Sequence, residues 1–325
     1  MTTLTTNLAG VSLRSPIILA AGTAGVLDEM SDVVDLSRVG AIVTKSITRQ
    51  PREGNATWRI LPAEAGMLNA IGLANPGLDT FVREIAPRAA SVPAPAFMSI
   101  AGYSIDDYVT CAAAADALGF PAVELNVSCP NVHGGCEFGA DPTLLATLVR
   151  EVRRVLTRTR LFVKLSPVSI AVGGVGIVQL ARAAIEPDGS TPAGPNQRPG
   201  ADALCLCNTT PAMAIDVATR RPRLANVTGG LSGAAVHPIV VKIIHDVFRQ
   251  VAKQTTTPII GIGGVQRWEH AAEFVLAGAS CVEVGTALFA DPRAPIKIAA
   301  GLERWVRDQG AASLSELVGQ VRLPS

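Results

Sequence analysis

Eight short apolar runs recur along the chain, and their spacing restricts the possible folds more than any other feature. Each run is rich in Val, Ile, Leu and Ala, and a stretch long enough for a crossover helix separates it from the next. Strands that are apolar throughout are buried on both faces, as in a parallel sheet covered by helices. The predicted strands are Ile17–Ala20, Ala41–Thr44, Ala96–Ile100, Ala122–Leu125, Leu161–Leu165, Ala203–Leu206, Ile259–Gly261 and Cys281–Val284.

Eight parallel strands that alternate with helices predict a closed (β/α)₈ TIM barrel of the α/β class, formed by residues 1–325 as one domain. Helix signals between the strands support this alternation. Asp106-Asp107 precedes an Ala-rich run that ends at Gly119, Asp141-Pro142 opens a run through Val155, and His237-Pro238 opens a run that ends near Ala252.

Three segments stand outside the alternation. Leu4–Leu8 and Val11–Leu13 flank Ala9-Gly10, which predicts an N-terminal β-hairpin that closes the barrel floor. Residues 186–200 contain four prolines and three glycines and predict a surface insertion without helix or strand. Residues 66–77 are expected to form a long loop after the second strand. This loop is rich in backbone donors that could wrap a carboxylate, although a simple connecting loop fits its composition equally well.

The charge balance excludes several classes of partner. The 325 residues include 28 Lys and Arg against 27 Asp and Glu, so no strong field exists to hold nucleic acid or an anionic membrane. The first residues lack the basic start and apolar run of a signal peptide, and no apolar run approaches the roughly 18–20 residues that span a bilayer. We therefore expect a cytoplasmic protein that acts on a small molecule.

Six cysteines, at positions 111, 129, 136, 205, 207 and 281, show no Cys-x-x-Cys spacing. This pattern argues against a zinc site, an iron–sulfur cluster or a disulfide framework in this chain, so no metal site is predicted. Most of these cysteines are expected to be small buried hydrophobic residues, and an exception has to be justified by its surroundings.

Polar and glycine residues gather at the carboxyl ends of the predicted strands, where parallel α/β folds place their active sites. Any one of them could be an ordinary cap or turn former. Two lysines and two asparagines that converge on one barrel mouth instead favour a binding site. The residues are Gly22 with Thr23, Lys45 with Ser46, Ser99, Asn126, Lys164, Asn208 with Thr209, Gly263 with Gly264, and Gly285 with Thr286.

Glycines after the seventh and eighth strands predict a phosphate site. Gly261-Ile-Gly-Gly264 and Gly285-Thr286 lie where barrels commonly hold a phosphate through backbone N–H groups, although such pairs serve many phosphorylated ligands. Lys164 ends an otherwise apolar strand, and its ammonium needs a negative or electron-accepting partner to offset desolvation. A reduced flavin ring would provide such charge.

The segment that leaves the fourth strand, residues 126–139, is the most informative. It reads Asn-Val-Ser-Cys-Pro-Asn-Val-His-Gly-Gly-Cys-Glu-Phe-Gly, and it combines a thiol, Cys129, with hydrogen-bonding side chains and a Gly-Gly pair able to hinge. We predict that residues 126–140 form an active-site lid. The alternative for Cys129 is a buried structural cysteine, and for Cys136 that structural interpretation is preferred.

Three segments together resemble the dihydroorotate dehydrogenases, specifically the class 1 enzymes, over nearly the whole chain. They are Asn-Val-Ser-Cys-Pro-Asn at 126–131, Gly-Met-Leu-Asn-Ala-Ile-Gly-Leu at 66–73 and Asn-Val-Thr-Gly-Gly-Leu-Ser-Gly at 226–233. The resemblance implies FMN-dependent oxidation of dihydroorotate to orotate in de novo pyrimidine (UMP) biosynthesis, with Cys129 as the catalytic base. Class 2 relatives use Ser at that position and carry a membrane-binding N-terminal extension, so the resemblance is to class 1.

Position by position, the resemblance assigns two sets of residues. The substrate set, which includes backbone groups around the carboxylate, is Lys45, Asn69, Ile71, Gly72, Leu73, Asn126, Asn131, Asn208 and Thr209. An asparagine amide offers both a donor and an acceptor to a pyrimidinedione edge, and a cation or a cluster of N–H groups suits the carboxylate. The FMN set is Ala21, Gly22, Lys45, Ser46, Ser99, Asn126, Lys164, Gly233, Gly263, Gly264, Gly285 and Thr286.

The resemblance is stronger to class 1B than to class 1A. The Met-Leu-Asn-Ala-Ile-Gly-Leu segment and the His-Gly-Gly loop resemble class 1B, whose members pass electrons to NAD through a partner subunit that carries FAD and a [2Fe-2S] cluster. Ser99 resembles the fumarate-linked class 1A instead, and the 186–200 tract and Cys205-Leu-Cys207 are departures. Class 1 implies a homodimer, and class 1B a heterotetramer.

Two other enzyme classes fit parts of the pattern. A pyrimidine reductase of the dihydropyrimidine dehydrogenase type would share the barrel, the flavin and the cysteine loop, but the carboxylate-ready loop at Asn69 favours orotate. A non-redox aldolase or isomerase could bind a sugar phosphate through the same glycines, and a colourless purified protein would indicate it.

In the expected mechanism, the Cys129 thiolate removes a proton from carbon 5 of dihydroorotate, and a hydride leaves carbon 6 for FMN. A free cysteine has a pKa of about 8.5, so neighbouring N–H groups or lysine charge can make it a competent base near neutral pH. Lys45 would steady the oxygen on which enolate charge develops, and Lys164 would steady the reduced flavin.

Overall fold

The structure of the protein is a computed structural model. It describes residues 4–128, 138–167, 176–190 and 198–324. Eight parallel strands close into a barrel in which each strand pairs with its neighbours in chain order. The predicted (β/α)₈ barrel is therefore confirmed, and each predicted strand end lies within one residue of the observed one. The barrel strands are β3 (Ile17–Leu19), β4 (Ala41–Val43), β7 (Ala96–Ile100), β8 (Ala122–Asn126), β9 (Arg160–Leu165), β10 (Ala203–Leu206), β15 (Ile259–Ile262) and β16 (Cys281–Val284).

Side chains along each barrel strand alternate between the barrel interior and the surrounding helices, because successive residues of a strand point to opposite faces. The rings of Phe97 and Phe162 meet edge to face in the interior, with centroids 5.2 Å apart. The lower interior is filled by one apolar cluster, which consists of Leu8, Leu13, Ile18, Ala41, Val43, Phe97, Ala122, Phe162, Ala203, Cys205, Ile260 and Cys281.

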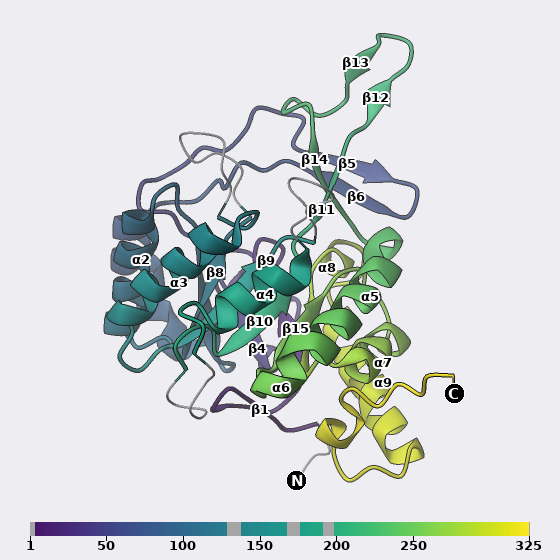
Figure 1. Cartoon of the computed structure of the whole chain (residues 1–325). Helices are drawn as coiled ribbons and strands as arrows, with labels where there is room; N and C mark the ends of the chain where they lie inside the picture. Colours follow the sequence, from purple (N-terminus) through teal and green to yellow (C-terminus); the bar gives the residue numbers. More distant parts are fainter. Residues whose placement is uncertain (1–3, 129–137, 168–175, 191–197, 325) are drawn as a thin grey trace.

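The N-terminal hairpin closes the barrel floor, as predicted. Strands β1 (Thr6–Leu8) and β2 (Val11–Leu13) pair antiparallel around a turn at Ala9 and Gly10, both of which have positive φ. Leu8 and Leu13 are fully buried in the interior cluster. Figure 1 shows β1 at the end of the barrel opposite β5 and β6.

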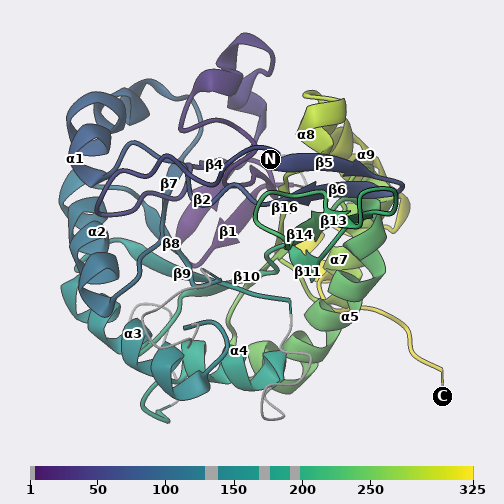
Figure 2. The same ribbon diagram turned by 90° about the horizontal axis from the view of Figure 1, so that it is seen from above.

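Helices surround the barrel (Figure 2). Asp141 caps α3 as the sequence predicts, whereas the N-cap of α2 is Ser104, so Asp106 and Asp107 lie in the first turn. The helical segment that begins at His237 continues through Thr255, three residues beyond the predicted end. The longer helices are α2 (Ile105–Leu118), α3 (Pro142–Val155), α4 (Ile177–Ile185), α5 (His237–Val247), α7 (Trp268–Ala277) and α9 (Ala294–Asp308), and the short ones are α1 (Leu78–Thr80), α6 (Lys253–Thr255) and α8 (Ala287–Ala290).

Tighter or wider helical turns complete several crossovers. The crossover from β3 to β4 has only two short 3₁₀ turns among its elements, which departs from the expected strand–helix alternation. Residues 78–91 are helical throughout but change from α to π to 3₁₀ geometry. These turns are η1 (Glu29–Asp32), η2 (Leu36–Arg38), η3 (Phe81–Ile85), η4 (Ala86–Ser91), η5 (Ala234–Val236), η6 (Phe248–Ala252) and η7 (Leu314–Leu317).

A second, four-stranded antiparallel sheet lies over the carboxyl ends of the barrel strands (Figures 1 and 2). It corrects the prediction that residues 66–77 are a loop, because residues 66–69 form a strand that pairs on both sides. Glycine permits this pairing, since a Cβ on Gly66 would lie 1.9 Å from the carbonyl oxygen of Ser232. The strands are β5 (Ile60–Ala63), β6 (Gly66–Asn69), β11 (Thr210–Ala212) and β14 (Gly229–Ser232), and a separate ribbon is formed by β12 (Ile215–Asp216) and β13 (Arg221–Pro222).

Two further predictions concern glycine-containing segments. Gly261 lies inside β15, in agreement with the predicted strand Ile259–Gly261, so only Gly263 and Gly264 of the Gly261–Gly264 segment lie in the loop after the strand. A Cβ on Gly261 would meet the Phe274 ring at 2.6 Å, where helices pack on the barrel. The predicted surface insertion, residues 186–200, contains no helix or strand in its described parts, 186–190 and 198–200. Its end is nevertheless anchored, because the buried Arg198 guanidinium donates to Thr257 Oγ1 at 2.6 Å. Among the described residues, no helix is long and apolar enough to cross a bilayer.

Candidate active site

The barrel mouth brings together two asparagines predicted to contact the substrate. Asn126 ends β8 and Asn208 follows β10, and Asn208 Nδ2 donates to Asn126 Oδ1 at 3.1 Å. Asn126 Oδ1 also accepts from Ser128 Oγ at 2.6 Å, while the N–H of Thr209 donates to Asn208 Oδ1 at 2.8 Å. Asn126 Nδ2 donates to Ser46 Oγ at 3.3 Å. These bonds fix amide groups from different strands in one orientation.

The loop that carries the predicted catalytic cysteine starts and ends at this cluster. Cys129 directly follows Ser128, and the N–H of Gly139, beyond the loop, donates to Val127 O at 3.0 Å. Phe138 is buried and packs edge to face on Tyr108, whose hydroxyl donates to Asn126 O at 2.8 Å. The predicted site residues Cys129 and Asn131, and Cys136, lie outside the described residues.

The other four cysteines are buried and unpaired, as predicted. Burial raises the pKa of the Cys111 thiol to about 12 and raises the pKa of Cys205, Cys207 and Cys281 still further. A thiol with such a pKa is a poor base or nucleophile, because the reactive form is the thiolate. These four side chains therefore serve as packing groups.

Lys45 follows β4 and places a partly buried ammonium at the mouth. Burial lowers its pKa. No ion pair or side-chain hydrogen bond joins it to any residue that the structure describes. Gly22, on the neighbouring β3 loop, has positive φ, and a Cβ there would lie 3.5 Å from Lys45 Nζ. A cation in this setting is suited to a ligand that is anionic or that develops negative charge.

The loop after β6 turns its carbonyl groups into the protein. Asn55 N–H, Arg52 Nε and Asn75 Nδ2 donate to the carbonyl oxygens of residues 71, 72 and 73 at 3.0, 3.2 and 2.7 Å. Gly72 and Leu73 both have positive φ. Since the carbonyls are occupied, the N–H groups of Ile71, Gly72 and Leu73 are the polar groups left for an anion. Asn69 stands at the start of this loop, and its Nδ2 donates to Gly230 O at 3.2 Å.

Glycines from two loops form a close-packed cradle at the ends of β14 and β15. Gly233, Gly263 and Gly264 have φ of 98°, 150° and 68°, and a Cβ on Gly264 would lie 2.6 Å from Gly233 O. The imidazole of His237 lies against this turn, and its Nδ1 is 3.1 Å from Gly263 O. Backbone this free of side chains can approach a phosphate closely.

The remaining members of the predicted FMN set border the mouth or lie directly beneath it. Ala21 and Gly22 follow β3, and Gly285 and Thr286 follow β16. Thr286 Oγ1 donates to Ser232 Oγ at 2.8 Å, which connects the β16 end to the second sheet. Ser99 is fully buried within β7, where its hydroxyl lies 2.9 Å from Ser46 Oγ.

Lys164 has buried acidic partners that the sequence analysis did not select. Its Nζ lies 3.2 Å from Glu283 Oε2 and 3.5 Å from Glu124 Oε1, and all three side chains are almost fully buried. Burial acts to lower the pKa of Lys164, but the two carboxyl groups outweigh it and raise that pKa. A sequence signal existed, because each acid interrupts an apolar strand, in Val-Glu-Leu and Val-Glu-Val.

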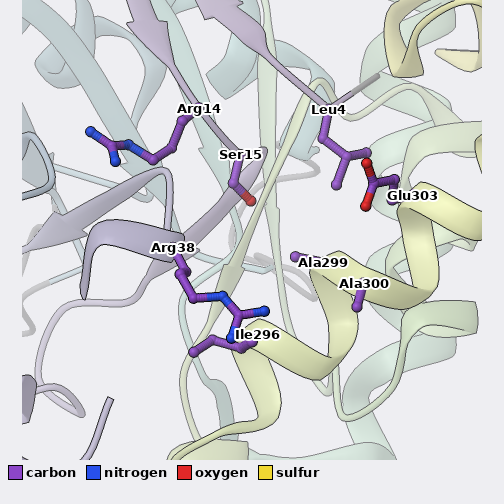
Figure 3. Close-up of a pocket in the computed structure, with 8 residues that line it drawn as sticks. All are labelled: Leu4, Arg14, Ser15, Arg38, Ile296, Ala299, Ala300 and Glu303. Atoms are coloured by element: carbon purple, nitrogen blue, oxygen red, sulfur yellow. The ribbon is translucent and has the colours of Figure 1, made fainter. Parts of the chain in front are cut away.

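A groove of about 290 Å³ lies at the opposite end of the barrel (Figure 3). It is lined by residues that precede β3 and β4 and by one face of α9, among them Arg14, Arg38 and Glu303. Barrel enzymes place their chemistry at the carboxyl ends of the strands, so this groove is not the candidate active site.

The chain is similar to dihydroorotate dehydrogenases. The family model described as dihydroorotate dehydrogenase matches residues 3–306. A dihydroorotate dehydrogenase B (NAD(+)), catalytic subunit, of Trichlorobacter lovleyi is 43% identical over 315 residues, which cover 96% of each chain. A protein of Bacteroides thetaiotaomicron with the same name is 40% identical over 99% of this chain and 100% of its own. A Solibacter usitatus protein named for dihydroorotate dehydrogenase A (fumarate) is 43% identical over 98% of both chains.

Proposed function

The chain belongs to the dihydroorotate dehydrogenase family, and on that basis we propose that it oxidises dihydroorotate to orotate at the barrel mouth, with FMN as its cofactor. The observation that carries this proposal is the arrangement at the mouth, where the fixed amides of Asn126 and Asn208 border the ammonium of Lys45, which has no ion-pair partner among the described residues. The amides match the hydrogen-bonding edge of a pyrimidine, and the ammonium matches a carbonyl that gains negative charge.

The cradle glycines fit the phosphate of FMN. A Cβ on Gly233 would lie 2.5 Å from Gly66 Cα, and one on Gly264 would meet Gly233 O, so larger residues would push these loops apart. Gly285 and Thr286, in the loop after β16, complete the set of residues proposed to contact the phosphate. Ala21, Gly22, Ser46, Ser99, Asn126 and Lys164 are proposed to hold the ring system.

When bound, FMN accepts the hydride that leaves carbon 6 of dihydroorotate. Cys129 acts as the base that removes the proton from carbon 5, and its place directly after the fixed Ser128 supports that role. Lys45 stabilises the oxygen on which negative charge develops. Asn69, Asn126, Asn131, Asn208 and Thr209 orient the ring, while backbone N–H groups of residues 71–73 bind the carboxylate. Residues 126–140 close over the substrate and exclude water.

Substitution of Gly264 by alanine is expected to weaken FMN binding at least about 10-fold, equivalent to a loss of about 1.4 kcal/mol. The reason is the contact of the new Cβ with Gly233 O, in addition to strain at a φ of 68°. Gly310→Ala is the matched control, because Gly310 has a φ of 69° with nothing within 4 Å of its Cβ position. Flavin fluorescence during titration measures both affinities. Equal FMN affinity in the two variants would contradict the cradle.

The electron acceptor is proposed to be NAD⁺, reached through a partner subunit that carries FAD and a [2Fe-2S] cluster. The relatives of Trichlorobacter and Bacteroides, both named as catalytic subunits of an NAD(+) enzyme, support this proposal. We expect the purified chain to oxidise dihydroorotate with an artificial acceptor and to reduce NAD⁺ only after such a partner is added. Rapid turnover with fumarate by the chain alone would instead support the A type, for which the Solibacter relative is named.

A homodimer is also proposed, and exposed apolar side chains on the β12–β13 ribbon and just before β5 support it. Ile215 and Val217 on the ribbon are 56% and 88% exposed, and Trp58, before β5, is 71% exposed. Val217→Asp is expected to shift the chain toward monomer, because a charge opposes burial in an interface core. Val33→Asp, at a side chain 51% exposed elsewhere, serves as the control. Analytical ultracentrifugation measures the result, and a dimer of unchanged affinity would exclude this surface.

A further inference from the structure

A polar layer lies inside the barrel between the apolar floor and the mouth. Glu124 on β8, Lys164 on β9 and Glu283 on β16 are 1%, 4% and 1% exposed. Each lies two residues after an inward-facing residue of the same strand, Ala122, Phe162 and Cys281, so its side chain also points to the barrel axis. The Lys164 ammonium is within 3.5 Å of an oxygen of each carboxyl group. Two acids therefore share one cation.

Charge and hydrogen-bond counts both indicate one proton on the two acids. With both carboxylates ionised, the cluster would have a net charge of −1 in the barrel interior, which is costly. Glu124 Oε2 and Glu283 Oε1 are buried and accept a hydrogen bond from no residue that the structure describes. One carboxyl oxygen of each lies within 4.8 Å of the other. A shared proton would supply the missing donor and neutralise the cluster.

The surroundings of the cluster agree with a shared proton. The described titratable groups around Glu283 are Lys164, Glu124, Cys205 and, two residues away on the same strand, Cys281. Strands β3, β4 and β15 present Ile18, Val43 and Ile260 to the layer below. Burial raises the pKa of Glu283 to about 8, Lys164 opposes that rise, and Glu124 adds to it. The Cys205 thiol is neutral because burial raises its pKa. A metal ion would be repelled by the ammonium that already lies between the acids.

Hydrogen bonds connect this cluster to the mouth. Ser99 Oγ donates to Glu124 Oε1 at 3.2 Å and lies 2.9 Å from Ser46 Oγ, which accepts from Asn126 Nδ2 at 3.3 Å. A change of charge on Glu124 is therefore transmitted to groups proposed to touch FMN and substrate. The low dielectric of the interior strengthens the effect.

We propose that Glu124 and Glu283 hold a single shared proton, and that the neutral cluster they form with Lys164 keeps its ammonium in place beneath the flavin site. Both acids are then positioning residues for FMN reduction. This inference rests on the proposed function, because it requires FMN above Lys164. Loss of the shared proton at alkaline pH adds a negative charge under the site, which disfavours the entry of electrons.

The proton itself is tested by infrared difference spectroscopy of the purified full-length chain between about pH 6 and about pH 10, on both sides of the Glu283 pKa of about 8. The wild-type chain is expected to lose a carbonyl band of a buried carboxylic acid as the pH rises. Glu283→Gln and Glu124→Gln should each remove that band. Glu64→Gln, at an exposed acid, should retain it. A wild-type chain without the band would overturn the shared proton.

The effect on the flavin is tested by the midpoint potential of bound FMN over the same pH range. The potentials of wild type and Glu283→Gln should agree near pH 6 and separate above about pH 8, with the wild type more negative, because only its cluster can still lose a proton. Identical potentials at all pH values would overturn the role of the cluster in flavin reduction. A chain that binds no FMN would refute the proposed function. The infrared carbonyl band would still show whether the two acids hold a proton.

The double variant Glu124→Gln/Glu283→Gln distinguishes an effect of charge on stability from an effect of side-chain packing. Each single variant keeps a neutral cluster and should unfold within a few degrees of the wild type at neutral pH. The double variant leaves the Lys164 ammonium buried without a carboxylate, and its unfolding temperature should fall by much more than the sum of the two single shifts. Additive shifts in the double variant would contradict a shared proton.

Discussion

Cys129→Ser is expected to bind FMN normally and to reduce it with dihydroorotate about 10²–10⁴-fold more slowly than the wild type, the range that a general base contributes. The hydroxyl of serine has a far higher pKa than a thiol, so it is rarely ionised at neutral pH. Stopped-flow bleaching of the flavin absorption measures the rate directly. The rate should partly recover at high pH, where the deprotonated fraction rises.

The matched control for this variant is Cys136→Ser, which makes the same substitution in the same loop. We expect it to reduce FMN at close to the wild-type rate, because no function is assigned to that thiol. Bleaching at the full wild-type rate in Cys129→Ser would refute the assignment of the base. An equal loss in both variants would indicate disruption of the loop instead of loss of the proton acceptor.

Lys164→Met is expected to destabilise the fold by about 3–5 kcal/mol, as for other buried ion pairs that lose one partner. The substitution leaves Glu124 and Glu283 without a cation, at 1% exposure each. Lys242→Met is the control, because Lys242 makes an exposed ion pair with Asp246 and such pairs contribute about 0–1 kcal/mol. Urea unfolding measures both free energies, and equal losses would contradict the structural role of Lys164.

The stability of Lys164→Met should also depend on pH. Burial and the neighbouring Glu124 raise the pKa of Glu283 and Lys164 opposes that rise, so without the ammonium the pKa of Glu283 lies further above that in the unfolded chain and the folded state binds more protons. Such groups contribute most stability below the unfolded pKa and lose it as the pH rises through the folded pKa. The loss relative to wild type should therefore be smaller near pH 5 than near pH 8. FMN retention should fall as well, and an FMN-saturated, fully active variant would contradict the placement of Lys164.

Local patterns were sufficient for the barrel itself. Continuous apolar runs such as Ala96–Ile100 and Ala203–Leu206 predict buried parallel strands because burial on both faces leaves no polar alternation. The carboxyl-end location of Lys45, Asn126 and Asn208 then follows from topology, since parallel strands end on the same side. The family resemblance added chemical roles to these positions, but their contacts were unknown.

Pairings between distant segments were decided by the tertiary structure alone. The sequence predicts a loop where β6 lies, because the pairing of β6 with β14 joins Asn69 to Gly230 and such a bond leaves no mark in either local sequence. Glu124 and Lys164 come from the paired strands β8 and β9, but Glu283 comes from β16, the last strand of the barrel. Their proximity depends on the inward side of a closed barrel, and closure is a property of all eight strands together. Local sequence is sufficient to predict which elements form and at which end of the barrel they terminate. The three-dimensional fold sets which charged side chains neutralise one another, because electrostatic pairing depends on distance in space.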